Sequence, residues 1–334
     1  MNKQQIIVTD STIEKEDQFP IQIGLSACLA GKEVRFNGGH TQSRLCLDVL
    51  SKHFSFKTFC PEVAAGFSTP RPAMRLVGDP DSPKLVFSHD EVSDLTSQLV
   101  NGFKTTLSEF SSLDGYILMK NSPSCGLERV KVYQANGHPH QKRTAGLFAQ
   151  ALKEKYPLMP IEEEGRLHDD VLFDNFVLRV YAYNDFRQEV INKPSLHSLI
   201  AFHSRYKYLL MAHDQKKYRA LGRLLGSPIK ELLNKLIDTY FTIFMHTLAK
   251  PANKRNHTNT LFHILGYLKT SISSSARQSI ADVIIQYKNG IIPLITPLTL
   301  LKHYLALYGS SYINTQRYLT PYPQSMHPIR KFCG

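Results

Sequence analysis

Three cysteines stand where a thiol could serve as a metal ligand or a nucleophile. Cys28, Cys60 and Cys125 each follow within a few residues of a short apolar run that is typical of a buried strand. The carboxyl ends of parallel strands meet at one edge of a sheet, so a mainly parallel sheet would bring the three thiols together. Soft sulfur ligands favour zinc or an iron–sulfur cluster. The spacing also allows three buried cysteines that never meet, because the chain has no CxxC pair.

The other two cysteines have no predicted chemistry. Cys46 falls inside a predicted helix and is interpreted as a core residue, and Cys333 lies in the terminal segment. An odd total of 5 cysteines without a secretion signal does not indicate a disulfide framework.

The elements that would position these residues alternate between strand and helix in the first half of the chain. Strands are predicted at residues 21–27, 54–59, 116–119 and 158–162, and helices at 43–53, 90–113, 146–155 and 171–192. This order predicts an α/β domain with a mainly parallel sheet over residues 20–188, preceded by a flexible tail at residues 1–19.

The second half is predicted to be an all-α domain over residues 189–334. Amphipathic segments occur at residues 199–213, 215–225, 229–248, 256–272, 275–289 and 297–308. The boundary is placed just before Pro194, which interrupts the helical pattern.

Charge differs sharply between the two halves. Residues 1–189 hold 21 Lys and Arg against 24 Asp and Glu, a net charge of −3, whereas residues 190–334 hold 19 against 4, a net charge of +15. The sum is the net charge of +12 for the whole chain. The second half is expected to meet a polyanion, nucleic acid in preference to an acidic membrane surface, and a merely soluble basic domain is the alternative.

Membrane insertion and secretion are not predicted. No apolar run reaches the roughly 18 residues that a spanning helix needs, and the polar N-terminus lacks the apolar core of a signal peptide. We therefore expect a cytoplasmic protein with no membrane partner.

The motifs around the three cysteines resemble those of the 2-thiouracil desulfurase (desulfidase) family. In chain order they are Ser26-Ala27-Cys28-Leu29, Val34-Arg35-Phe36-Asn37-Gly38, Cys60-Pro61-Glu62-Val63 with Pro70-Arg71, and Ser122-Pro123-Ser124-Cys125-Gly126. The resemblance covers about residues 20–165. It implies an α/β fold in which three cysteines hold a [4Fe–4S] cluster whose fourth iron has no protein ligand.

The resemblance also implies roles for individual residues. The cluster ligands would be Cys28, Cys60 and Cys125. The thio sulfur would bind the open iron, Glu62 would activate a water that attacks the base, and Ser122 would relay a proton or orient the water. The alternatives are a solvated loop carboxylate for Glu62 and a turn hydroxyl for Ser122. Further substrate contacts are expected from Ser26, Asn37 and Ser124.

Residues 190–325 are similar to the YbgA-type helical domain, which occurs fused behind desulfidase domains. The similarity lies in residues 202–213, 254–259 and 293–303. Together the two resemblances imply a thiouridine desulfidase that removes sulfur from 4-thiouridine in tRNA.

Contacts with RNA are expected from the basic side chains of this domain. The predicted set is Lys207, His213, Arg219, Arg223, Lys254, Arg255 and His257. Tyr206, Tyr208 and Tyr218 lie among these charges and either stack on bases or belong to the helical core.

Three functions stay open at this point. The first is a [4Fe–4S]-dependent desulfidase of 4-thiouridine in tRNA, whose thiolated base would swing out of the RNA to reach the cluster. The second is a desulfidase of free thiouracil or thiouridine. The third is an iron–sulfur protein that binds nucleic acid and senses redox state without catalysis. No sulfide acceptor and no oligomeric state is predicted.

Overall fold

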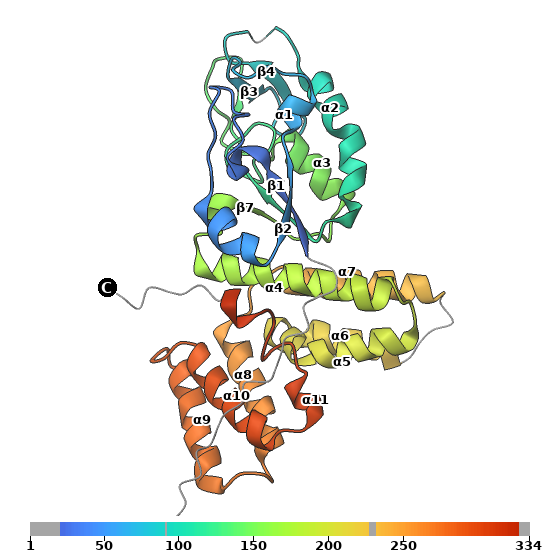
Figure 1. The fold of residues 1–334 in the computed structure, drawn as a ribbon, viewed down its shortest axis with the longest axis vertical. Coiled ribbons are helices and arrows are strands. Elements are labelled where there is room, and N and C mark those ends of the chain that lie inside the picture. The colour runs from blue at the N-terminus through green and yellow to red at the C-terminus, as the bar shows by residue number, and fades with distance from the viewer. Residues whose placement is uncertain (1–20, 91, 227–231, 327–334) are drawn as a thin grey trace, which may run out of the picture.

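A four-stranded parallel sheet carries the three cysteines. The computed structural model describes residues 21–90, 92–226 and 232–326, and it places the α/β part and the helical part at opposite ends of an elongated molecule (Figure 1). The strand order is β2 (Ser55–Phe59), β1 (Gln22–Ser26), β5 (Gly115–Leu118) and β7 (Ile161–Glu163), with every neighbouring pair parallel. This confirms the predicted fold class of the first half.

Both faces of the sheet are covered by helices. Helices α2 (Thr96–Ser108) and α3 (Leu147–Lys155) pack on one face, where Phe103 and Phe148 join Tyr116 in a buried cluster. Helix α4 (Asp170–Phe186) packs on the other face through residues such as Phe176. Side chains alternate between the two faces of a strand, and both sides are apolar here because both are buried.

A second, three-stranded sheet was not predicted. It has the order β4 (Lys84–Phe87), β3 (Met74–Val77) and β6 (Val132–Tyr133), with β3 antiparallel to β4 and parallel to β6. Strands of two to four residues are too short to show a periodic pattern. The helix predicted at residues 43–53 is also wrong, since this segment forms a π-helical turn (Leu45–Val49) followed by a 3-10 turn (Leu50–Lys52).

The second half consists of helices, as predicted. They are α5 (Leu196–His213), α6 (Gln215–Gly226), α7 (Leu233–Leu248), α8 (Lys254–Leu265), α9 (Ser274–Lys288), α10 (Ile295–Tyr308) and the short α11 (Ser311–Asn314). Shorter 3-10 turns occupy Glu109–Ser112, Glu164–Arg166, Gly266–Leu268 and Gln324–Met326. Part of the helix predicted at residues 229–248 falls on residues 227–231, outside the described segments.

Helix α4 joins the two halves. Its first turns pack against the parallel sheet, whereas Phe186 near its end stacks on Phe241 with ring centroids 4.2 Å apart and meets Phe202 edge-on at 4.9 Å. The helix therefore belongs to both cores, and it crosses the molecule between them in Figure 1. The boundary proposed at residues 188 and 189 falls just after it, in a π-helical turn (Arg187–Ile191).

The predicted tail at residues 1–19 and Cys333 lie outside the described residues. Among the helices of the described segments, none is both long and apolar enough to cross a bilayer.

Candidate active site

The three cysteines line one cavity of about 340 Å³ at the carboxyl ends of strands β1, β2 and β5. Cys28 and Cys125 are buried and Cys60 is half-buried. All three are free thiols. The parallel order of the sheet thus brings together residues that lie up to 97 positions apart in the sequence, since Cys28 and Cys125 stand at the same end of neighbouring strands.

Short helical turns hold Cys28 and Cys60 in place. Cys28 lies in a 3-10 turn (Ala27–Ala30) directly after β1, and its carbonyl accepts the N–H of Thr41 at 3.0 Å. Cys60 is the N-cap residue of α1 (Pro61–Ala64), with Pro61 at the first helical position, where its missing N–H costs nothing. Each thiol therefore sits at the point where a strand turns into a helix.

Cys125 is held by a serine-rich turn. The Oγ of Ser122 accepts the N–H of Cys125 at 3.0 Å and that of Ser124 at 3.2 Å. The carbonyl of Ser124 accepts the N–H of Phe148 at 3.0 Å, so the turn also satisfies a free donor at the start of α3. Gly146 permits this close approach, because a Cβ there would stand 2.5 Å from the carbonyl carbon of Ser124.

Burial and mutual repulsion raise the pKa of all three thiols. Burial raises the pKa of Cys28 to about 11, with a further contribution from Cys60. Burial also raises the pKa of Cys60, and it raises that of Cys125 well above its usual range, where the charges of Cys60 and Glu62 act in the same direction and a hydrogen bond with Ser26 acts against them. Only a cation among the three sulfurs would make the thiolates favourable.

The donor set fits a cluster better than a single ion. The described residues that line the cavity include three cysteines but no fourth cysteine and no histidine. Within the described segments, no three His, Cys, Asp or Glu side chains are grouped so as to hold one metal ion. A cluster binds each cysteine through a different iron, so its ligands need not converge on one point. Three soft donors around one cavity match that requirement.

Glu62 stands beside the cysteines in a hydrogen-bonded network. Its Oε2 forms an ion pair with Arg71, whose side chain is 2% exposed, and its Oε1 accepts a hydrogen bond from the hydroxyl of Ser124. Arg71 also donates to the carbonyls of Ser68 and Val34, each at 3.0 Å. The carboxylate is therefore fixed on both oxygens.

The network extends to Ser122 with a defined direction. The oxygens of Ser122 and Ser124 are 2.9 Å apart. Because Ser124 gives its only hydroxyl proton to an ionised carboxylate, Ser122 must be the donor in the contact between the two serines. The resulting chain runs from Ser122, which lines the cavity, through Ser124 to Glu62, which also lines it.

The expected substrate contacts need correction. Ser26 lines the cavity, but its Oγ accepts the N–H of Met119 at 3.0 Å. Asn37 does not line the cavity, because its Oδ1 accepts the N–H of Gly39 at 3.2 Å and closes its own turn. Ser124 is 1% exposed and lies behind the wall. These serines position other groups.

Sequence reasoning missed other lining residues. Phe36 is 42% exposed and lies at the cavity, with the guanidinium of Arg35 5.9 Å from its ring centroid. Lys120 and Asn121 line the opposite side. A large exposed aromatic next to a glycine-rich loop is the signal that could have identified Phe36.

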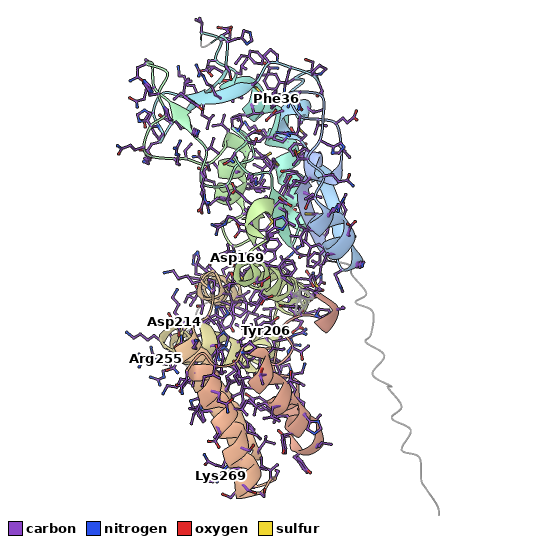
Figure 2. The ribbon with its side chains drawn as sticks, turned by 90° about the vertical axis from the view of Figure 1, so that its left-hand side faces the viewer. Phe36, Asp169, Tyr206, Asp214, Arg255 and Lys269 are labelled. Carbon is purple, nitrogen blue, oxygen red and sulfur yellow. The ribbon has the colours of Figure 1, made fainter. Side chains whose placement is uncertain are left out.

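Most of the basic residues predicted to contact RNA lie on the surface of the helical part. Arg219, Arg223, Lys254 and Arg255 are exposed. Lys207 and Arg219 line a recess of about 330 Å³ together with Tyr218 and Asn259, whose buried amide nitrogen has no hydrogen-bond partner. Figure 2 shows Arg255 at the level of the upper helical part, with Phe36 near the far end of the α/β part.

His213 and His257 do not belong to such a surface. Both line a cavity of about 840 Å³ between α4, α8, α9 and α10. The Nδ1 of His213 is 2.7 Å from the carbonyl oxygen of Lys250, and the Nδ1 of His257 is 3.0 Å from the hydroxyl of Tyr318. Burial lowers the pKa of each to about 4, so neither carries the charge that a phosphate would attract.

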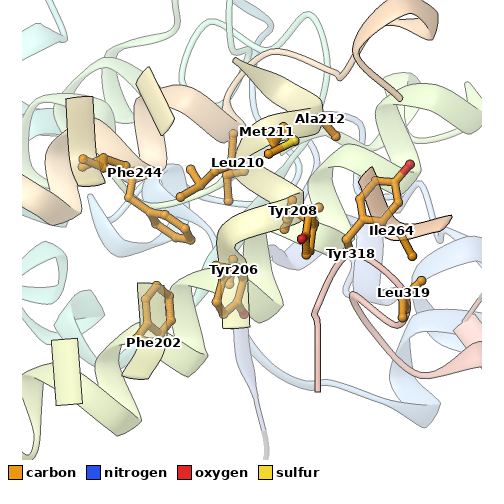
Figure 3. Packing of buried hydrophobic residues seen from close by; sticks show 14 of the residues in the cluster. Phe202, Tyr206, Tyr208, Leu210, Met211, Ala212, Phe244, Ile264, Tyr318 and Leu319 are labelled. Carbon is orange, nitrogen blue, oxygen red and sulfur yellow. The ribbon is translucent and has the colours of Figure 1, made fainter. Parts of the chain in front are cut away.

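Two of the three tyrosines are core residues. Tyr206 and Tyr208 are 1% and 2% exposed and lie in the packed cluster of Figure 3. Tyr206 stacks on Phe202 with centroids 4.3 Å apart. Of the tyrosines considered for base stacking, only Tyr218 lies at the edge of a surface recess.

Comparisons with known proteins agree with this division of the chain. The family model for 2-thiouracil desulfurase matches residues 23–164, and a model for a protein family of unknown function (DUF1722) matches residues 207–323. The uncharacterized protein YbgA of Escherichia coli (strain K12) is 35% identical over 155 residues, which are 45% of this chain and 90% of that protein. The uncharacterized protein YbbK of Bacillus subtilis (strain 168) is 33% identical over 110 residues, 30% of this chain and 71% of that protein.

The chain belongs to the 2-thiouracil desulfurase family in its N-terminal part and to the YbgA family in its C-terminal part. Both predicted resemblances are thereby confirmed. A solved structure of the [4Fe–4S]-dependent thiouracil desulfidase TudS is 29% identical, covers 44% of this chain and 93% of its own, and superposes with a TM-score of 0.35. The three-cysteine cavity lies wholly within the desulfurase domain, and the exposed basic residues lie in the YbgA-like domain.

Proposed function

We propose that this protein is an iron–sulfur-dependent desulfidase that removes the sulfur of 4-thiouridine in tRNA and leaves uridine and sulfide. The observation that carries the proposal is the hydrogen-bonded chain from Ser122 through Ser124 to Glu62, which begins and ends at the cavity that the three cysteines line. A protein that only sensed iron would not need a carboxylate oriented in this way.

The cysteines would hold the cofactor and Glu62 would do the acid–base work. Cys28, Cys60 and Cys125 would bind a [4Fe–4S] cluster, which supplies an open iron as a soft Lewis acid for the thio sulfur. Glu62 accepts a proton from a water in the cavity as the water oxygen attacks C4 of the base. The C–O bond forms, the C–S bond breaks, and sulfur leaves as sulfide while the oxygen remains in uridine.

The serines and Arg71 support this proton transfer. Arg71 keeps Glu62 ionised and fixed in orientation, because its buried guanidinium binds the carboxylate directly. Ser122 lies at the cavity wall, so its hydroxyl can take part in returning the proton from Glu62 by way of Ser124. Phe36 offers an exposed ring on which a pyrimidine can stack.

The shape of the molecule supports an extended substrate. Phe36 at the cavity lies near one end of the long axis, and Asp169 lies between it and Arg255 of the helical part (Figure 2). A free base would occupy only the cavity, whereas a folded RNA can reach both. The net charge of +15 on residues 190–334 favours such a polyanion.

The proposal is tested by desulfuration assays under anaerobic conditions. The reconstituted protein is given an RNA that contains 4-thiouridine, the free nucleoside, or 2-thiouracil, and the release of sulfide is measured. We expect the highest kcat/KM for the RNA, together with RNA binding that weakens as salt increases. Activity on the free base alone, without salt-dependent RNA binding, would reject tRNA as the substrate.

The variant Glu62→Gln separates the enzyme from a sensor. It keeps the shape of the side chain and removes the base, so we expect a loss of activity of about 10²-fold or more with unchanged iron content. Exposed Glu33→Gln is the matched control. Full activity in Glu62→Gln, or no desulfuration by the wild-type protein, would contradict the proposed reaction.

A further inference from the structure

A second recess adjoins the three-cysteine cavity and has a different chemical character. It has a volume of about 400 Å³, and it shares three lining residues, Met74, Asn121 and Pro123, with the cavity. Strands β3 and β6 of the small sheet form its floor through residues such as Leu76 and Tyr133. A group covalently attached to a base in the cavity would therefore lie in this recess.

The side chains of this recess are basic. Arg75, Arg129 and Lys131 line it, and none of its described lining residues is Asp or Glu. The neighbouring Glu128 faces elsewhere, since its carboxylate is 3.9 Å from the ammonium group of Lys153. Three positive charges gathered in a domain segment whose overall charge is −3 (residues 1–189) form a local site for an anion.

The backbone presents two of these side chains outward. Arg129 and Lys131 flank Val130, which is 4% exposed and exchanges backbone hydrogen bonds with Thr144 at 3.0 and 3.1 Å. Because successive side chains of an extended segment point to opposite sides, a buried Val130 leaves both basic residues exposed. The guanidinium of Arg75 lies 5.0 Å from the ring centroid of Tyr133, which places its charge over the floor.

Hydroxyl and amide groups complete the recess. Ser88 and Asn121 line it beside the basic residues. Asn121 stands at the junction with the cavity and has a left-handed backbone with φ of 57°, a conformation that asparagine tolerates better than most residues. Cationic side chains next to neutral hydrogen-bonding groups are the combination that binds a ribose phosphate.

We propose that this recess is a phosphate subsite, which binds the ribose phosphate attached to the thiolated base and makes the enzyme select nucleotides over free bases. The inference rests on the proposed desulfidase function and extends it to the α/β domain, which has no net positive charge of its own. It predicts that part of the RNA affinity lies beside the reaction cavity and not only on the helical domain.

The test compares substrates with and without phosphate on the double variant Arg129→Ala/Lys131→Ala. We expect kcat/KM for 4-thiouridine 5′-monophosphate and for an RNA containing 4-thiouridine to fall about tenfold or more, because charged hydrogen bonds to phosphate are lost. The value for 2-thiouracil should stay within about twofold, since a free base does not reach the recess.

Two controls make the result specific. Lys52→Ala/Lys104→Ala removes the same two charges from exposed positions away from the recess and should leave all substrates unchanged. Arg129→Lys/Lys131→Arg keeps the charges and should retain most of the preference for the monophosphate. Binding of uridine 5′-monophosphate by the wild-type protein and the alanine variant, measured by calorimetric titration, should weaken in parallel with kcat/KM.

The outcomes separate this inference from the proposed function. An equal loss on the free base and the monophosphate, or no loss on either with intact activity on the free base, would overturn the phosphate subsite alone. Absence of desulfuration with every substrate in the wild-type protein would overturn the proposed function, and the binding of uridine 5′-monophosphate would then decide the subsite by itself.

Discussion

The hydroxyl of Ser124 donates a hydrogen bond to the carboxylate of Glu62, which lies 62 positions earlier in the chain. This contact links the turn that holds Cys125 to the helix start that holds Cys60. One hydrogen bond therefore ties the predicted acid–base group to two of the predicted cluster ligands, and any displacement of the turn would also change the orientation of Glu62.

Removal of the Ser124 hydroxyl should slow the reaction without unfolding the protein. In Ser124→Ala, Glu62 keeps Arg71 but loses its connection to Ser122, so we expect kcat to fall about 10²-fold with little change in iron content. Ser43→Ala is a matched control, because the Ser43 hydroxyl also donates to a glutamate, Glu164, at 2.7 Å, outside the cavity. Equal activities of the two variants would contradict the relay.

Ser122→Ala should act differently, because Ser122 also caps the turn. Its loss leaves the N–H groups of Ser124 and Cys125 without their acceptor, which costs about 1 to 3 kcal/mol. We expect lower iron content as well as lower activity, and iron analysis after anaerobic reconstitution distinguishes this variant from Ser124→Ala. Full iron content in Ser122→Ala would mean that the cap is dispensable.

Arg71 is expected to stabilise the fold as well as the site. Its guanidinium is 2% exposed and binds Glu62 and two carbonyl groups, so Arg71→Ala leaves a partly buried carboxylate without its counter-ion. The free energy of unfolding should fall by about 3 kcal/mol, measured by urea denaturation. Arg166→Ala, which breaks the more exposed pair between Arg166 and Glu162, should cost about 1 kcal/mol or less. Similar losses in the two variants would contradict a structural role for Arg71.

The histidines of the helical part predict how stability depends on pH. Burial lowers the pKa of His203, His213 and His257 to about 4, below the ordinary value of 6.5. Between these values the unfolded chain binds more protons than the folded one, so the free energy of unfolding should fall as the pH drops from about 6.5 to about 4. This dependence should be weaker in His257→Gln than in the control His197→Gln, an exposed position. Identical pH profiles would show that His257 ionises freely in the fold.

The parallel sheet and the cysteine positions could be predicted because they depend on local patterns. Apolar runs identify the strands, and the carboxyl ends of parallel strands share an edge wherever the strands lie in the order. That logic placed Cys28, Cys60 and Cys125 around one cavity without knowledge of the loops between them.

The roles of single side chains in loops and on helices could not be predicted in the same way. Ser124 and Ser122 are both serines in one turn, and only the backbone geometry decides which faces the cavity. Asn37 closes its own turn for the same local reason. His213 and His257 appeared basic and exposed because the sequence does not show which helix face is covered by α4, α9 and α10.

The central claim is that three cysteines hold one cluster, and iron analysis tests it most directly. Iron and sulfide are measured after anaerobic reconstitution of the wild-type protein, of Cys28→Ala, Cys60→Ala and Cys125→Ala, and of Cys46→Ala, whose thiol is buried in the core away from the cavity. We predict one [4Fe–4S] cluster per chain in the wild type and in Cys46→Ala, and a loss of iron and of desulfuration in each of the other three. Wild-type iron content in any of those three variants, or no iron in the wild-type protein, would contradict the account.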